Sequence, residues 1–160
     1  AEVGETVNVA VLQEHWAVNV DQARGPSTVA THNWIGKLTP LHCTASGKVL
    51  LAAVGPAQRS ALLAASGVPR HTPRTIVDRA RLEAELARVV QRGCATAVEE
   101  YEVGLNALAA PVLDRSGEVI AAVSVSGPSY RLDERRLEAC LEPLLAATKE
   151  ISRRMGWFAG

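Results

Sequence analysis

The chain has 160 residues, and its fractions of hydrophobic (48%) and charged (21%) residues are ordinary for one globular domain with a sizeable core. Seventeen basic side chains balance 17 acidic ones, so the chain lacks the basic surface that nucleic-acid binding requires. Its apolar runs are too short to span a bilayer and no signal peptide opens the chain, so we expect residues 1–160 to act in the cytoplasm as a single domain without membrane partners.

The first predicted elements form a β-hairpin. Apolar and polar residues alternate over 6–11 and again over 16–20, with a short polar segment between the two runs. Gly25 and Pro26 then interrupt the chain before a third expected strand, roughly residues 27–35.

Three helices are predicted next, each from its capping residues. Thr44 is a suitable N-cap for a helix over 45–54. Pro56 stands in the first turn of a second helix that ends near Gly67. Asp78 caps a third helix, which closes at a glycine.

Strands return in the second half of the chain. One is expected over about 95–103, and a hairpin follows over 105–128. Asp133 then caps a last long helix. The order is therefore two or three strands, three helices, three strands and one helix. Hairpin-connected strands predict an antiparallel sheet flanked by helices, an α+β domain.

The hairpin over 105–128 is the most informative segment. Its turn runs from Asp114 to Gly117, and we expect Leu113 to pair with Glu118. This register predicts three further pairs: Leu105 with Ser126, Ala107 with Ser124 and Ala109 with Ala122.

One face of this hairpin then carries small side chains: Ala107, Ala109, Ala122, Ser124 and Ser126. Small residues on a buried strand leave room for a neighbour. That neighbour is either a closely packed helix or a bound small molecule with Ser124 and Ser126 as its polar contacts. Geometry alone leaves both interpretations open.

The sequence shows no arrangement typical of a metal site, a cofactor site or a catalytic centre. The four histidines have none of the spacings of metal ligands: His15, His32, His42 and His71. The three cysteines form no CxxC pair and are interpreted as small buried hydrophobic residues: Cys43, Cys94 and Cys140. Gly47 and Lys48 lack the flanking residues of a phosphate-binding loop.

Several ordered motifs resemble a known family. PLHCTASGKVLLA (40–52), EEYEVGLNALAAPVLDRSGEVIAAVSVSGP (99–128) and KEISRRMG (149–156) are similar to the C-terminal domain of IclR-type bacterial transcriptional regulators. The resemblance extends over essentially the whole chain. It implies a GAF-like (profilin-like) fold, in which an antiparallel sheet and helices cradle a small-molecule effector.

The resemblance also implies partners. Family members carry an N-terminal winged helix-turn-helix that binds operator DNA, and they assemble as dimers or tetramers. That domain is absent from this chain, so we expect an isolated effector-binding domain that is not an enzyme. It would form a homodimer or tetramer and reach operator DNA only through the missing domain.

The family's effector pocket can be transferred to this sequence by position. The start of the helix after LHCT contributes Ala45 and Ser46, and a helix N-terminus favours an anion such as a carboxylate. The alternate serines of SVSGP are Ser124 and Ser126, the same serines that the hairpin register selects. The resemblance thus favours the ligand interpretation of the small-residue face.

Two departures from the family bear on the ligand. Ala97 stands where members often have Asp, and Ala107 where many have Cys, so both changes enlarge the pocket. A larger, more apolar organic acid, such as an aromatic acid, fits this pocket better than a short keto acid. Trp34 is assigned either to the wall of the pocket or to ordinary packing.

Two other functions remain open at this point. The chain can be an oligomerisation module with a vestigial pocket, or a small stand-alone enzyme on a similar fold. Ligand-dependent melting separates the first from an effector-binding domain, and a catalytic constellation in the pocket would favour the second.

Overall fold

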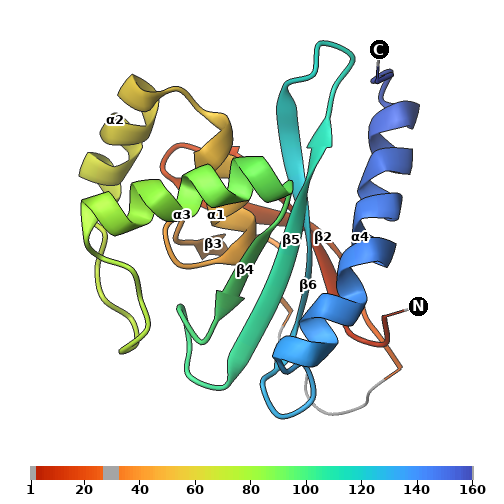
Figure 1. Cartoon of the computed structure of the whole chain (residues 1–160), viewed down its shortest axis with the longest axis horizontal. Coiled ribbons are helices and arrows are strands. Elements are labelled where there is room, and N and C mark those ends of the chain that lie inside the picture. The colour runs from red at the N-terminus through yellow and green to blue at the C-terminus, as the bar shows by residue number, and fades with distance from the viewer. Residues whose placement is uncertain (1–2, 27–32, 160) are drawn as a thin grey trace.

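The computed structural model describes residues 3–26 and 33–159, which form an antiparallel sheet and four helices (Figure 1). The strands are β1 (Thr6–Gln13), β2 (Trp16–Ala23), β3 (Leu38–Thr39), β4 (Ala95–Val98), β5 (Leu105–Leu113) and β6 (Val119–Pro128). The helices are α1 (Ala45–Ala53), α2 (Pro56–Ser66), α3 (Arg79–Arg92) and α4 (Glu134–Arg154). The predicted α+β class and the predicted order of elements are confirmed.

The six strands lie in the order β3-β2-β1-β6-β5-β4, and every neighbouring pair is antiparallel. Strand β1 therefore pairs with β6, which lies more than 100 residues further along the chain. The helices α1, α2 and α3 lie on one side of the sheet and α4 on the other (Figure 1). No helix in the described part of the chain has the length and apolar character needed to cross a membrane.

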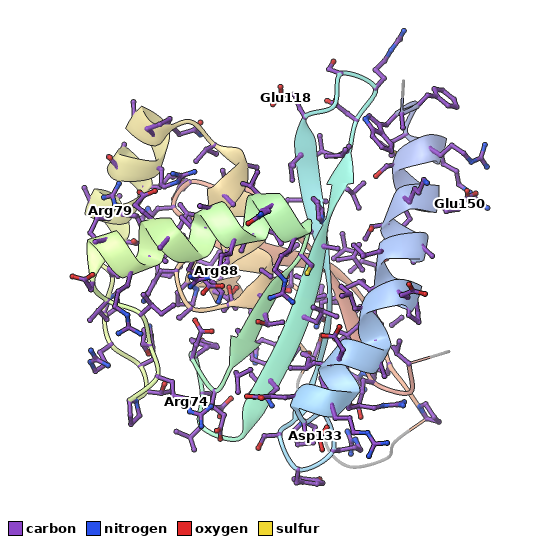
Figure 2. The ribbon with its side chains drawn as sticks, in the orientation of Figure 1. Arg74, Arg79, Arg88, Glu118, Asp133 and Glu150 are labelled. Atoms are coloured by element: carbon purple, nitrogen blue, oxygen red, sulfur yellow. The ribbon has the colours of Figure 1, made fainter. Side chains whose placement is uncertain are left out.

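The caps begin the helices where the sequence predicts them. The Asp78 and Asp133 carboxylates accept hydrogen bonds from the third backbone amide of α3 and α4. Figure 2 places Asp133 at one end of the molecule and Glu118, beside the β5–β6 turn, at the other. The long hairpin thus runs the full length of the sheet.

The start of α1 is unusually tight. The Thr44 hydroxyl accepts a hydrogen bond from the Gly47 amide (3.1 Å) and donates to the Pro40 carbonyl (2.6 Å). A Cβ at position 47 would lie 2.5 Å from the Leu41 Cα and from the Thr44 Oγ1. Only glycine therefore lets the helix begin so close to the preceding segment.

The two faces of the sheet bury different side chains. Residues Leu108, Val123 and Val125 face α4 together with the valines of β1. The opposite face is made of smaller residues, and Ala109 and Ala122 pack there without exposure to solvent. Because alanines take so little space, α1 packs directly against β5 and β6.

Two predicted strands need correction. Residues 27–32 lie outside the described residues, but 33–35 are not strand, and β3 begins only at Leu38. The chain turns first, because Gly36 adopts a left-handed φ of 79° and the Lys37 amide bonds the Trp34 carbonyl (3.0 Å). The strand expected over 95–103 ends at Val98, because Glu99 has a left-handed φ of 53°.

The expected hairpin register is also wrong by two residues. Ala107 pairs with Ser126 and Ala109 with Ser124. Leu113 pairs with Val119, one residue beyond the expected partner Glu118, and a bulge between Val112 and Leu113 shifts the rest of the ladder by one residue more. A register shift of two residues keeps every side chain on its predicted face of the sheet. The predicted small-residue face is therefore correct although the predicted pairs are not.

Candidate ligand-binding site

A cavity of about 60 Å³ opens where α1 leaves the small-residue face uncovered. It lies between the beginning of α1 and five strands of the sheet, β1, β2, β3, β5 and β6. Its lining residues are Asn8, Asn19, Trp34, Thr39, Thr44, Ala45, Ser46, Tyr101, Leu105, Ala107, Ser124 and Ser126. The small-residue face is thus divided: Ala109 and Ala122 pack under the helix, whereas Ala107, Ser124 and Ser126 face the cavity.

The first turn of α1 forms one wall. Ala45 and Ser46 are its first two residues, and a helix has no internal acceptor for amides at these positions. Thr44 caps the Gly47 amide and its carbonyl accepts from Lys48, so neither interaction uses the amides of Ala45 and Ser46. Within the described residues these two amides have no acceptor, and they carry the positive end of the helix dipole.

The sheet forms the opposite wall. Ser124 and Ser126 on β6 are 6% and 9% exposed, and their hydroxyls can donate to a carboxylate. Asn8 on β1 lies beside Ser124 in the ladder, and its Nδ2 donates to the Ser126 Oγ at 3.4 Å. The Asn8 Oδ1 atom is buried and has no hydrogen-bond partner among the described residues.

Two aromatic side chains complete the lining. Trp34 follows β2, and the Lys37 ammonium lies 5.3 Å from the centre of its ring. Tyr101 lies in the loop between β4 and β5. Burial raises the pKa of the Tyr101 phenol, so it is neutral and able to donate a hydrogen bond at pH 7.

The loop that carries Tyr101 is held from two sides. The Thr72 hydroxyl donates to the Glu99 carbonyl (2.6 Å) and the Thr75 hydroxyl to the Glu100 carbonyl (2.7 Å). From the other side, the Lys48 ammonium on α1 lies 2.9 Å from the Glu100 carboxylate. Burial raises the pKa of the Glu100 carboxyl, and the charge of Lys48 opposes that increase. The lysine is therefore engaged with Glu100, and the described lining of the cavity contains neither lysine nor arginine.

The structure brings together most of the predicted site residues. Ala45, Ser46, Ala107, Ser124, Ser126 and Trp34 all line the cavity. Ala97 does not: it pairs with Ala107 across β4 and β5 and packs in the core, because α1 covers that part of the sheet. It therefore adds no depth to the cavity, contrary to the expectation. That the six lining residues bind an effector stays a prediction.

Sequence reasoning missed several lining residues, most notably Asn8 and Tyr101. Alternation in β1 places Asn8 on the same face as Thr6 and Ala10, which is a usable signal. That signal points to the cavity only when β1 is known to pair with β6. Tyr101 had no such signal, because the loop after β4 was expected to be strand.

A second cluster lies close to α1. The ligating atoms of His42, Cys43 and His71 come within 4.8 Å of one another. Burial lowers the pKa of His42, whose Nε2 lies 2.8 Å from the Pro69 carbonyl oxygen. Burial also raises the pKa of the Cys43 thiol to about 12. Three groups are one fewer than a structural zinc site needs.

The chain matches the family model described as "Bacterial transcriptional regulator IclR C-terminal" over residues 1–153. The "HTH-type transcriptional repressor AllR" of Salmonella typhi is 37% identical over 153 residues. That alignment covers 96% of this chain and 56% of the repressor, so the chain spans little more than half of its relative's length.

Solved structures agree in fold. The IclR protein of Thermotoga maritima superposes with a TM-score of 0.89 at 31% identity, covering 98% of this chain and 63% of that chain. A double mutant of the PobR inducer-binding domain from Acinetobacter, in complex with 3-hydroxybenzoic acid, has a TM-score of 0.86 at 30% identity. It covers 94% of this chain and 89% of that chain.

Proposed function

The chain belongs to the IclR family of bacterial transcriptional regulators, as their C-terminal regulatory domain, and we propose that its cavity binds a small organic acid. Binding of this effector would control attachment of the parent regulator to operator DNA. The observation that carries the proposal is that free helix amides at Ala45 and Ser46 face two serine hydroxyls across one cavity.

The ligand's charge follows from these donors. Two backbone amides, the helix dipole and the hydroxyls of Ser124 and Ser126 all favour an acceptor that carries negative charge. A cavity without lysine or arginine among its described lining holds a carboxylate by directed hydrogen bonds rather than by a counter-charge.

The size of the ligand follows from the remaining walls. Leu105, Ala107 and the Trp34 ring offer apolar surface to the part of the ligand that lies beyond its carboxylate. An acid with an apolar or aromatic body uses this surface, whereas a short keto acid leaves it empty. The 3-hydroxybenzoic acid in the PobR complex is an acid of this kind, which supports the proposal.

The full regulator would bind DNA through a segment outside residues 1–160, because this chain has no net charge and its repressor relative is longer. We also expect a cytoplasmic homo-oligomer, since symmetric half-sites are read by paired heads. Val20, Ile35 and Leu38 expose apolar surface near the β3 edge of the sheet and are candidates for that contact. Sedimentation at tens of micromolar tests this point, and a monomer would contradict it.

The two alternative functions, a stand-alone enzyme and an oligomerisation module, predict different properties of the cavity. Among the described lining residues the ionisable side chain is the neutral Tyr101 phenol, which favours ligand binding over acid–base catalysis. A purely structural module would show no ligand-dependent melting. Thermal melting of the chain with a panel of small aromatic and aliphatic acids separates these functions, and stabilisation by at least one acid is expected.

The serines provide the decisive control. Ser126→Ala should weaken binding of the stabilising acid by about tenfold to a hundredfold, because a hydrogen bond to a charged group contributes about 1.5–3 kcal/mol. The fold should survive, since alanine fits the same strand position. Ser116→Ala, in the exposed β5–β6 turn, is the matched control and should bind as the unaltered chain does. Equal affinity in all three proteins would show that the ligand does not contact Ser126 and binds elsewhere.

A further inference from the structure

We propose that Asn8 selects the effector by accepting a hydrogen bond from an O–H or N–H group of the ligand. The inference rests on the proposed function, because it adds a second recognition point to the same cavity. It identifies the effector class as small carboxylic acids that also carry a hydrogen-bond donor, either a hydroxyl or an amide.

The state of the Asn8 side chain is the first step. Asn8 is 4% exposed and lines the cavity from β1. Its Nδ2 donates to the Ser126 Oγ, and this contact orients the amide. Its Oδ1 is then a buried acceptor without a partner among the described residues. Such an atom costs free energy in a folded protein unless water or a ligand satisfies it, so beside a cavity it offers a point for a ligand to bind.

Among the described lining residues, Asn8 alone has a buried side-chain oxygen without a hydrogen-bond partner. Thr39 donates its hydroxyl to the Ala17 carbonyl (3.0 Å), and Thr44 donates to the Pro40 carbonyl (2.6 Å). Ser126 receives the Asn8 amide and keeps its own proton for a carboxylate. A hydroxyl can rotate to donate or to accept, whereas a carbonyl oxygen can only accept. Asn8 therefore imposes a requirement that the serines do not.

The cavity consequently offers hydrogen-bond donors at one end and an acceptor on β1. The end formed by α1 offers donors and fits the ligand's carboxylate, and the Asn8 Oδ1 on β1 offers an acceptor and fits a donor group. A site built to receive a donor rejects an analogue without one, because the buried acceptor is then left unpaired in the complex. A plain acid or a keto acid should bind more weakly than its hydroxy or amide counterpart.

Two matched pairs of acids test this inference. Benzoate and 3-hydroxybenzoate differ by one hydroxyl, while pyruvate and oxamate differ by a methyl group in place of an amide NH₂. Calorimetric titration of the chain should show at least one donor-bearing acid binding about tenfold more tightly than its partner. The pair that shows the preference identifies the donor as hydroxyl or amide.

The Asn8→Ala variant supplies the second arm. It should reduce the donor preference to about twofold or less while leaving the affinity for the donor-free acid nearly unchanged. Gln13→Ala, at the exposed end of the same strand, is the matched control and should keep the preference. A melting temperature measured for each variant separates lost binding from lost fold.

The outcomes distinguish the two proposals. If acids bind and Ser126→Ala weakens them but no donor preference exists, the role of Asn8 is wrong and the proposed function stands. A preference for 3-methoxybenzoate, which has no donor, over 3-hydroxybenzoate would mean that the site requires no donor, which also overturns the inference. If no acid of either pair binds, the inference and the proposed function fail together.

Discussion

The Lys48 ammonium lies 2.9 Å from the Glu100 carboxylate, and this ion pair joins the helix that begins at the cavity to the loop that carries Tyr101. Lys48 is buried, with 1% of its side-chain surface exposed, and Glu100 is largely covered, with 12% exposed. The pair therefore connects two walls of the candidate site, and its removal should affect stability and the cavity together.

Lys48→Met should lower the free energy of unfolding by about 3 kcal/mol at pH 8, because it leaves a buried carboxylate without its partner. Lys48→Met combined with Glu100→Gln should recover much of this loss. Chemical denaturation of the two variants provides the measurement. Burial already raises the pKa of Glu100, and losing Lys48 should raise it further, so the single variant should lose less stability at pH 5 than at pH 8. Equal losses in the single and double variants would contradict the pairing.

Ala107→Leu should affect ligand binding and Ala109→Leu should affect stability, although both residues lie on the same face of β5. Position 107 faces the cavity, so a leucine there should abolish acid binding with little loss of stability. Position 109 is fully buried under the helix, so a leucine should cost about 1–3 kcal/mol through overpacking. Titration and denaturation of both variants decide this. If Ala107→Leu binds acids normally, the cavity is not the binding site.

Acid should destabilise the chain through His42. Burial lowers the pKa of His42 in the folded state, so the unfolded chain takes up the proton first as the pH falls through about 6.5. The stability contributed by neutral His42 is thus present above this pH and decreases below it. Chemical denaturation at pH 7.5, 6.5 and 5.5 measures the free energy of unfolding. This free energy should decrease less with falling pH for His42→Gln than for the unaltered chain. His15→Gln, in the β1–β2 turn, should leave the decline unchanged.

The cysteines should be inert in the native protein. Cys43, Cys94 and Cys140 are at most 3% exposed, and burial raises the pKa of each thiol. A disulfide reagent such as DTNB should label none of them within minutes at pH 8, and all three after denaturation. One thiol per chain that reacted within minutes in the native protein, and no longer reacted in Cys43→Ala, would contradict this prediction. It would show that the loop beside α1 opens readily.

Local chemistry in the sequence determined much of this molecule. Thr44, Asp78 and Asp133 begin helices because a side-chain oxygen satisfies amides only three residues away. Alternation along β5 and β6 placed the small residues on one face, and that face tolerated a register error of two residues. Interactions of this range need no knowledge of the rest of the chain.

Tertiary structure alone decided how that face is used. Pairing of β1 with β6 brings Asn8 beside Ser124 and Ser126 from a distant part of the sequence. The position of α1 then determines which small residues are covered and which line the cavity, so Ala97 and Ala109 are packed while Ala107 is open. Both relationships depend on contacts between distant segments, and a one-dimensional pattern of residue types does not contain them.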